Sequence, residues 1–292
     1  MKNFKKLALM GLTAVMSLSL LAACGGGNSG SAETPANNTE TPSVENTETP
    51  AASGEFTTVE AGKLIMSTNA QFPPYEMVGD GEGYEGTGYE GIDVEIAYAI
   101  AQKLGLELVV DNMGFDAALQ AVQTGKSDIV MAGVTVTDDR LEVMDFSDTY
   151  ANGIQVVIVP ENSDIATIDD LEGKLIGCQM GTTGYIYCSD TPENGGYGED
   201  AVIPYDDGAA AVQALMNGQV DCVVIDNAPA QEYVKANPGL KILDTEFANE
   251  NYAIGFAKGN TALMDAVNAA LIELVEDGTV QSIIDKYIPA EG

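Results

Sequence analysis

The distribution of apolar residues divides the chain into three stretches. Residues 7–23 form a predominantly apolar run that follows three lysines and leads into Cys24. The run is shorter than the about twenty residues that a membrane-spanning helix needs, and it is typical of an export signal. Residues 25–54 hold almost no large apolar side chain, so this segment does not bury enough surface to fold by itself. The pattern predicts a signal peptide over residues 1–23, a disordered tether over residues 24–55 and a globular body from Phe56 onward.

Within the globular body, one pattern of apolar and polar positions occurs twice. Residues 117–133 read AALQAVQTGKSDIVMAG and residues 210–226 read AAVQALMNGQVDCVVID, so seven of seventeen aligned positions are identical. Each copy predicts a helix with one apolar face, a glycine that ends it and a short buried strand. The repeat indicates two similar α/β lobes. Gly133 and Asp226 then lie at the carboxyl ends of equivalent strands, where open α/β sheets bind their ligands.

The remaining pattern supplies further elements of both lobes. Residues 91–105 place isoleucines at every fourth position, on one face of a helix that Gly105 ends. If the chain returns to the first lobe after the second repeat, two crossing segments form a hinge near residues 151–156 and 249–252. The predicted lobes comprise residues 56–152 with 250–292, and residues 153–249. We also expect strands that begin with Lys-Leu-Ile at 63 and 174, a strand over 252–257, and helices over 261–276 and 280–287.

Composition and charge exclude several classes of function. The chain carries a formal charge of −33 and has no histidine. The lack of histidine removes Ser-His-Asp and Cys-His nucleophile pairs and histidine metal sites, and we expect neither a metal nor another cofactor. The excess of acids argues against binding to nucleic acid or another polyanion. Of the cysteines left after processing, two form a disulfide in one interpretation, and all are small buried apolar residues in the interpretation that we favour: Cys178, Cys188 and Cys222.

The only arginine of the chain, Arg140, is the first candidate for binding chemistry. It follows Thr137 by three positions, and a threonine there suits the cap of a helix whose first N–H groups have no internal partners. A guanidinium beside free N–H groups suits a carboxylate. Arg140 has the plainer alternative of a weak surface ion pair with Asp138 or another acid. Asp226, three residues before Pro229, likewise has the alternative role of capping the following helix.

Six short motifs lie along the globular body. They read TNAQFPPYE at 68–76, YEGIDVE at 89–95, GVTVTDDR at 133–140, FSDTY at 146–150, QMGTTG at 179–184 and VID at 224–226. Together they resemble those of one family, the solute-binding proteins of polar amino acid ABC transporters, known as extracellular solute-binding protein family 3. The resemblance covers almost all of residues 56–289, and it implies an α/β fold of two lobes, the type II periplasmic-binding fold, with two sheets joined by a two-segment hinge.

The end of the apolar run, Leu21-Ala22-Ala23-Cys24, resembles a bacterial lipobox. This resemblance implies cleavage before Cys24 and a lipid on that cysteine, which anchors the protein at a membrane surface. A spanning anchor or plain secretion is the alternative.

The family resemblance also implies roles for individual residues. Arg140 and Thr135 bind the α-carboxylate of an amino acid, together with the amides of residues 181–183 and the Thr183 hydroxyl. Asp226 and the Gly133 carbonyl bind the α-ammonium group. Plainer interpretations are an ordinary strand-to-helix turn for residues 181–184, core positions for the phenylalanines and surface positions for the amides. The residues that match the side-chain pocket are Asn69, Phe72, Phe115 and Gln179.

Asn69 bears on the ligand, because members that favour cationic ligands often carry a carboxylate at this position. No lysine or second arginine lies in a matched position to pair with an acidic side chain. We therefore expect a neutral polar side chain, glutamine first, with a flat cation between the two phenylalanines as the alternative.

The function implied by the resemblance is capture and transfer. It is that of an extracytoplasmic monomer, lipid-anchored to the bacterial cell membrane, which binds an L-amino acid and delivers it to an ABC transporter permease and its ATPase without covalent chemistry. Two alternatives share the fold: a domain that presents its ligand to a membrane kinase, and an enzyme similar to the cyclohexadienyl dehydratases.

Overall fold

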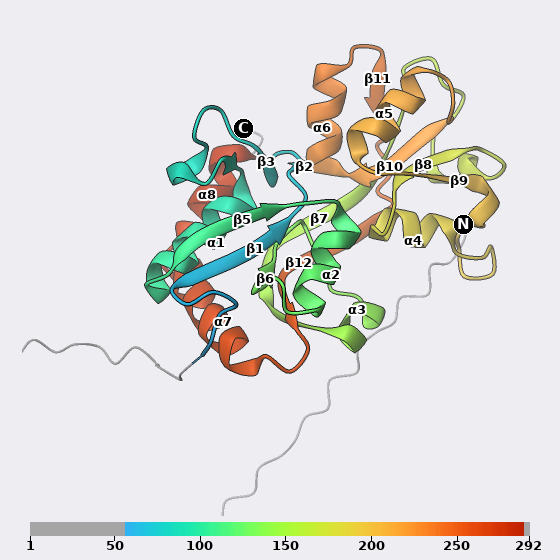
Figure 1. Cartoon of the computed structure of the whole chain (residues 1–292). Coiled ribbons are helices and arrows are strands. Elements are labelled where there is room, and N and C mark those ends of the chain that lie inside the picture. Colours follow the sequence, from blue (N-terminus) through green and yellow to red (C-terminus); the bar gives the residue numbers. More distant parts are fainter. Residues whose placement is uncertain (1–55, 289–292) are drawn as a thin grey trace, which may run out of the picture. The chain divides into compact units, whose positions relative to one another are not determined.

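Residues 56–288 are described by a computed structural model of the chain (Figure 1). The expected signal peptide, the tether and the lipidation site at Cys24 lie outside the described residues. Within residues 56–288, no helix is both long enough and apolar enough to cross a membrane.

Both repeated segments fold as their pattern predicts. The first copy forms α2 (Phe115–Gln123) and β6 (Ile129–Val130), and the second forms α5 (Gly208–Met216) and β10 (Cys222–Asp226). In each helix the alanine, leucine and valine positions of one face are buried. Both strands are buried along their whole length, because they lie inside a sheet.

Each lobe contributes three parallel strands to a sheet of nine strands with the order β5-β1-β6-β12-β7-β10-β8-β9, where β11 pairs with β7 off this path. In the first lobe, β1 (Lys63–Thr68) lies between β5 (Glu107–Asn112) and β6. In the second lobe, β8 (Ile176–Gln179) lies between β9 (Val202–Tyr205) and β10. The antiparallel strands are β7 (Met144–Pro160), β12 (Ala248–Ala257) and β11 (Leu240–Ile242).

The two predicted crossing segments lie within β7 and β12, and they pair with each other. Ala248 lies opposite Gln155, and Asn251 lies opposite Asn152, in antiparallel register. Because β7 and β12 continue from one lobe into the other, the hydrogen-bonded sheet is continuous, and the sheets of the two lobes meet along these strands. The lobe boundaries after residues 152 and 249 stay predictions, since neither strand breaks there.

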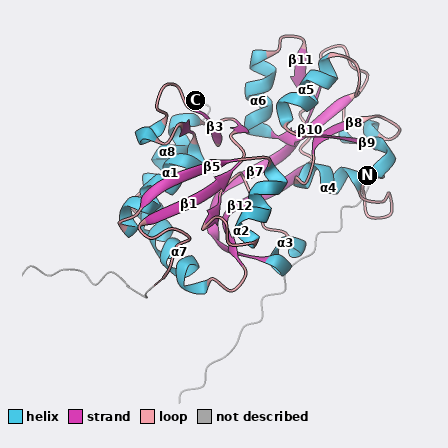
Figure 2. Cartoon of the chain, in the orientation of Figure 1, coloured by secondary structure: helices cyan, strands magenta, loops and turns pink. Residues whose placement is uncertain are grey.

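Helices gather around the strands of each lobe (Figures 1 and 2). In the first lobe, α1 (Ile92–Leu104), α7 (Thr261–Glu276) and α8 (Thr279–Tyr287) pack against one another. The predicted isoleucine face of α1 is fully buried, and Gly105 ends the helix in the left-handed conformation. The second lobe carries α4 (Thr183–Ser189) and α6 (Asn227–Ala236) beside α5. The remaining elements are α3 (Asp138–Val143), β2 (Gln71–Phe72), β3 (Glu76–Val78), β4 (Tyr89–Glu90) and the 3-10 turns η1 (Tyr84–Gly86), η2 (Ile168–Leu171) and η3 (Glu199–Ala201).

The cysteines of the second lobe are Cys178, Cys188 and Cys222. All three are free and buried, in one apolar cluster with Val157 and Ile176. The interpretation that we favoured from the sequence, three small buried apolar residues, is therefore confirmed. The hydrogen bond with Cys178, and then burial, raise the pKa of Cys188 well above its usual value, so its thiol is protonated at neutral pH.

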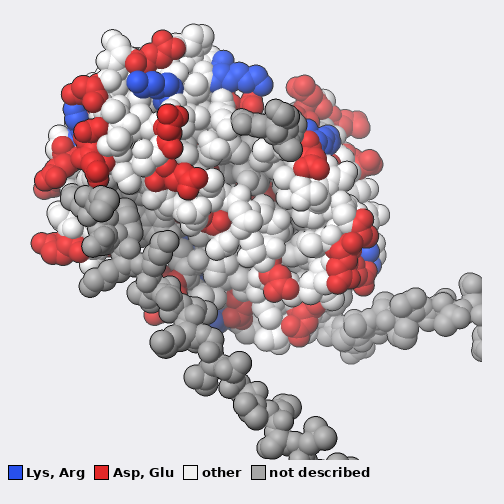
Figure 3. Space-filling view, turned by 180° about the vertical axis from the view of Figure 1, so that it is seen from behind, with Lys and Arg blue, Asp and Glu red and all other residues white. Residues whose placement is uncertain are grey.

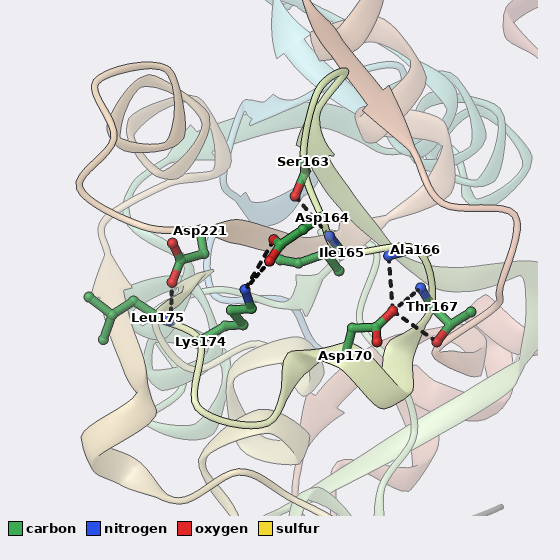
Figure 4. Close-up of polar contacts among 9 residues, drawn as sticks. All are labelled: Ser163, Asp164, Ile165, Ala166, Thr167, Asp170, Lys174, Leu175 and Asp221. Atoms are coloured by element: carbon green, nitrogen blue, oxygen red, sulfur yellow. Dashed lines mark hydrogen bonds and ion pairs between the residues drawn. The ribbon is translucent and has the colours of Figure 1, made fainter.

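Acidic side chains cover much of the surface. On the face shown in Figure 3 they are spread widely, while basic side chains occur in a few separate places. Some of these acids fasten loops of the second lobe (Figure 4). Lys174 donates to both carboxylate oxygens of Asp164 at 3.1 Å, and Asp170 accepts from the backbone N–H of Thr167 at 2.9 Å. Exposed contacts of this kind stabilise the fold only weakly. The excess of acids as a whole therefore does not account for the stability of the fold.

Candidate functional site

One pocket, with about 330 Å³ of empty space that includes open solvent, lies where the strand ends of the two lobes meet. All nine residues that the sequence assigned to ligand binding line this pocket, and Glu76, Ala132 and Thr182 join them. The nine are Asn69, Phe72, Phe115, Gly133, Thr135, Arg140, Gln179, Thr183 and Asp226.

Arg140 lies at the start of α3, where Thr137 caps the helix by accepting from the Arg140 N–H at 3.3 Å. The guanidinium is 8% exposed and donates to the carbonyl of Thr135 at 2.8 Å and to that of Gly181 at 3.1 Å. Within the described part of the chain, no ion pair joins Arg140 to Asp138 or another acid. Burial lowers the pKa of Arg140, so its charge is held in an environment where an incoming anion is attracted strongly.

Asp226 ends β10 on the opposite wall and is 8% exposed. It occupies the cap position of α6, but its side chain makes no capping hydrogen bond. Instead one oxygen accepts from Gln155 Nε2 at 2.7 Å, and the other accepts from the Tyr252 hydroxyl. Burial raises the pKa of Asp226 to about 7, against the hydrogen bond from Tyr252, which lowers it. A cation in the pocket would favour the charged carboxylate.

The side-chain end of the pocket combines amides and aromatic rings. Gln179 Nε2 donates to Asn69 Oδ1 at 3.0 Å, and both amides are buried, so neither is a surface residue. The Phe115 ring packs under the Arg140 guanidinium, with 5.5 Å between the guanidinium carbon and the ring centroid. Phe72 faces Gly133, where a Cβ atom would come within 2.8 Å of the ring. Because glycine has no side chain, position 133 leaves room for the Phe72 ring.

The turn at residues 179–183 connects β8 to α4, as the sequence predicted. Thr182 caps α4 by accepting from the Tyr185 N–H at 3.3 Å. Thr183 is 4% exposed and lines the pocket. The turn therefore brings backbone and hydroxyl groups of the second lobe to the same pocket as Arg140 of the first.

Glu76 is the pocket residue that sequence reasoning missed. It lies at the start of β3 and is fully buried. If its carboxyl group is ionised, no group among the described residues donates a hydrogen bond to either of its oxygens. Burial, and then the nearby Asp93, raise the pKa of Glu76 well above its usual value. Asp93 accepts from the Gly133 N–H at 3.0 Å. The signal that could have found Glu76 is its place in the matched motif, four residues after Phe72.

Taken together, the pocket places a cation and an anion on walls from different lobes, with amides and rings beside them. This arrangement suits a zwitterion, because each charge of the ligand meets an opposite charge or oriented dipoles. Among residues 56–288, no group of acids and cysteines is arranged to hold a metal ion.

Comparisons with known proteins agree with this geometry. A protein named "Probable histidine-binding protein" from Neisseria gonorrhoeae is 34% identical over 79% of this chain and 85% of its own length. The L-cystine-binding protein TcyJ of Escherichia coli (strain K12) is 32% identical over 80% of this chain and 85% of its own. Both names describe binding proteins.

Solved structures show the same fold. An ancestral arginine-binding protein bound to arginine is 39% identical, with a TM-score of 0.69 over 78% of this chain and 98% of that one. The arginine-, lysine-, histidine-binding protein ArtJ from Geobacillus stearothermophilus is 32% identical, with a TM-score of 0.70 over 79% of this chain and 96% of that one. The predicted two-lobe fold of the type II periplasmic-binding kind is thereby confirmed.

The model of the bacterial extracellular solute-binding proteins, family 3, matches residues 64–290. This match spans both lobes and every residue that lines the pocket. The chain therefore belongs to the bacterial extracellular solute-binding proteins of family 3.

Proposed function

We propose that this chain is an extracytoplasmic receptor that binds one L-amino acid between its lobes and delivers it to an ABC importer. The observation that carries the proposal is the pair Arg140 and Asp226: two buried opposite charges on one pocket, each from a different lobe. Only closed lobes bring both charges to the same molecule, so ligand binding shifts the equilibrium toward closure. The receptor catalyses no reaction.

The individual roles follow from the walls of the pocket. Arg140 binds the ligand α-carboxylate, with Thr135 on its own lobe and Thr183 on the other. Asp226 and the Gly133 carbonyl bind the α-ammonium group. The side chain of the ligand then lies among Asn69, Phe72, Phe115 and Gln179.

Glu76 changes the reasoning about the ligand side chain. The expectation of a neutral side chain rested on Asn69, which carries no charge. Glu76 places a carboxyl group on the same pocket, so a cation between Phe72 and Phe115 also has a partner. Relatives are named for arginine as well as for glutamine. We propose a polar side chain, with L-glutamine and L-arginine as the two ligands to test first.

Anchoring and partners complete the proposal. A lipid on Cys24 holds the receptor at the bacterial cell membrane, and the tether over residues 24–55 lets the folded body reach its permease. The receptor acts as a monomer together with that permease and its ATPase. Uptake of labelled ligand by a deletion strain separates transport from a sensing role.

Charge reversal at Arg140 tests the binding site. We expect Arg140→Glu to lose at least about a hundredfold in affinity, because a buried partner of the carboxylate becomes a repelling charge. A thermal-shift screen of the twenty amino acids with cystine, ornithine and citrulline identifies the ligand, and calorimetry then measures its affinity. Lys235→Glu makes the same charge change at an exposed residue of α6 and should keep the affinity of the native protein. Undiminished affinity in Arg140→Glu would overturn the assignment.

A further inference from the structure

Glu250 is a buried charge beside the pocket to which no role has been given. It lies in β12 opposite Gly153 of β7, where the two strands cross between the lobes. The residue is 1% exposed, and neither carboxylate oxygen has a donor in regular hydrogen-bond geometry. A buried acid without firm partners costs stability, so its position calls for a function.

The two residues that follow Glu250 in β12 contact the segment that holds Arg140. The Asn251 carbonyl accepts from the Val136 N–H at 3.2 Å, and Tyr252 forms a β-bridge with Thr135, whose carbonyl accepts from Arg140. Burial raises the pKa of Glu250, while the hydroxyls of Thr135 and Thr183 and the charge of Arg140 lower it by less. Glu250 is also the acid that acts most strongly on Arg140. The titratable and charged groups that face it from the surrounding elements are Arg140 in α3, Asp226 in β10, Tyr187 in α4 and Tyr252 in β12.

In the absence of ligand, Glu250 therefore balances part of the charge of Arg140. When an α-carboxylate binds to Arg140, two negative charges share one guanidinium, and their repulsion opposes binding. This effect acts through charge, since no ion pair within 4.0 Å joins Glu250 to Arg140 in the described residues.

We infer that Glu250 is a counter-charge of Arg140 that weakens the binding of the ligand α-carboxylate and thereby sets the affinity of the site. The inference rests on the proposed function. It assigns to Glu250 an indirect role, exerted through Arg140, and it predicts that removing an acid beside the site strengthens binding.

A cycle of two proteins and two kinds of ligand tests the inference. The proteins are the native chain and Glu250→Gln, and the ligands are L-arginine and L-glutamine, each compared with its α-carboxamide. We expect Glu250→Gln to bind the amino acids roughly five- to tenfold more tightly, the size of a unit charge acting through partly screened protein. The α-carboxamides lack the negative charge, so their affinity should change by less than about twofold.

Two further variants separate charge from shape. Glu250→Asp keeps the charge and should bind the amino acids with nearly the native affinity. Glu246→Gln makes the same chemical change at an exposed acid just before β12 and should also keep the native affinity. Weaker or unchanged amino-acid binding by folded Glu250→Gln, or an equal gain for amino acid and carboxamide, would overturn the inference.

The pH dependence of the native protein gives a second readout that needs no variant. Protonation of Glu250 removes its charge, so the affinity ratio of amino acid to carboxamide should rise as pH falls through the raised pKa of this residue. Asp226 binds the ammonium group of both ligands, so its titration cancels in this ratio. A ratio that stays constant or falls contradicts the inference. If the native protein binds neither amino acid, the two proposed ligands are wrong. Measurements on the native protein alone show this, independently of the Glu250 variants.

Discussion

At the scale of single residues, burial disfavours the charged form of the acids in and beside the pocket. Burial raises the pKa of Asp226 to about 7 and that of Asp93 to about 6, and it raises the pKa of Glu76 well above its usual value. Each shift means that the folded protein disfavours the charged form. The free energy of unfolding is therefore lowered at neutral pH by these buried acids, of which Glu76 and Asp226 line the pocket.

Asp226→Asn should stabilise the ligand-free protein while it abolishes ligand binding. The folded pKa of Asp226, about 7, lies above the unfolded value, so native stability is lost as pH rises from about 4 through 7. Asparagine does not ionise. The variant should gain on the order of 2 kcal/mol over the native protein at pH 8, and the gain should shrink as pH falls toward 5. Urea unfolding at both pH values measures it.

Asp200→Asn makes the same substitution at an exposed position and serves as the control for this measurement. A native protein that is as stable as Asp226→Asn at pH 8 would show that Asp226 carries no penalty. The comparison needs ligand-free protein, because a bound amino acid adds its own stabilisation.

Sequence reasoning identified some of these residues and missed others for a physical reason. Arg140 is the only arginine among many acids, so its rarity made it visible. Glu76 and Glu250 are two of 45 acids, and composition does not tell which acids the fold buries. Glu250 lies in the predicted hinge, but its proximity to Arg140 depends on the bridge between Tyr252 of β12 and Thr135, which lie more than a hundred positions apart.

At the scale of elements, the turn between β8 and α4 shows how closely the lobes fit. Gly181 has a φ of +76°, and a Cβ atom there would lie 1.7 Å from a carboxylate oxygen of Asp116 in α2. Asp116 belongs to α2 of the first lobe and Gly181 to the second lobe. A side chain at position 181 would therefore have to displace the Asp116 carboxylate for the lobes to approach in this way.

Gly181→Ala should weaken ligand binding more than it weakens the fold. The added methyl group meets Asp116 only when the lobes are closed, so it opposes closure, and we expect about a tenfold loss of affinity. Gly218→Ala is the matched control, because Gly218 has a φ of +68° with open space where its Cβ would lie. It carries similar backbone strain and should keep the native affinity. Calorimetry with equal losses for both variants would refute the steric explanation.

Local periodicity predicted α1 and both repeats because each element shows its buried face within one short window. It did not predict the full length of β7, which runs from Met144 to Pro160. This strand mixes buried and exposed positions without alternation, since β12, β10 and β11 pair with different parts of it. The partners are distant in sequence, so a local pattern does not reveal them.

At the scale of the whole folded body, four side-chain hydrogen bonds among residues 56–288 join the lobes at or beside the pocket. Gln179 donates to Asn69, Arg140 donates to the carbonyl of Gly181, and the Tyr252 hydroxyl donates to Asp226. Each of these three involves at least one residue that lines the pocket. The fourth runs from the Tyr233 hydroxyl to the carbonyl of Gln71 at 2.9 Å, and both residues lie outside the pocket lining, so this bond contributes to closure without touching the ligand.

Tyr233→Phe should therefore lower ligand affinity by about fivefold, the effect of one lost hydrogen bond in the closed state. Tyr197→Phe is the matched control: its hydroxyl donates to the carbonyl of Ile168 at 3.1 Å, with both residues in the second lobe. That bond persists whether the lobes are open or closed, so its loss should lower the unfolding temperature and leave the affinity unchanged. Calorimetry and thermal unfolding of both variants separate these effects. If Tyr233→Phe kept full affinity, or if Tyr197→Phe lost as much, the contact from α6 to β2 would have no part in closure.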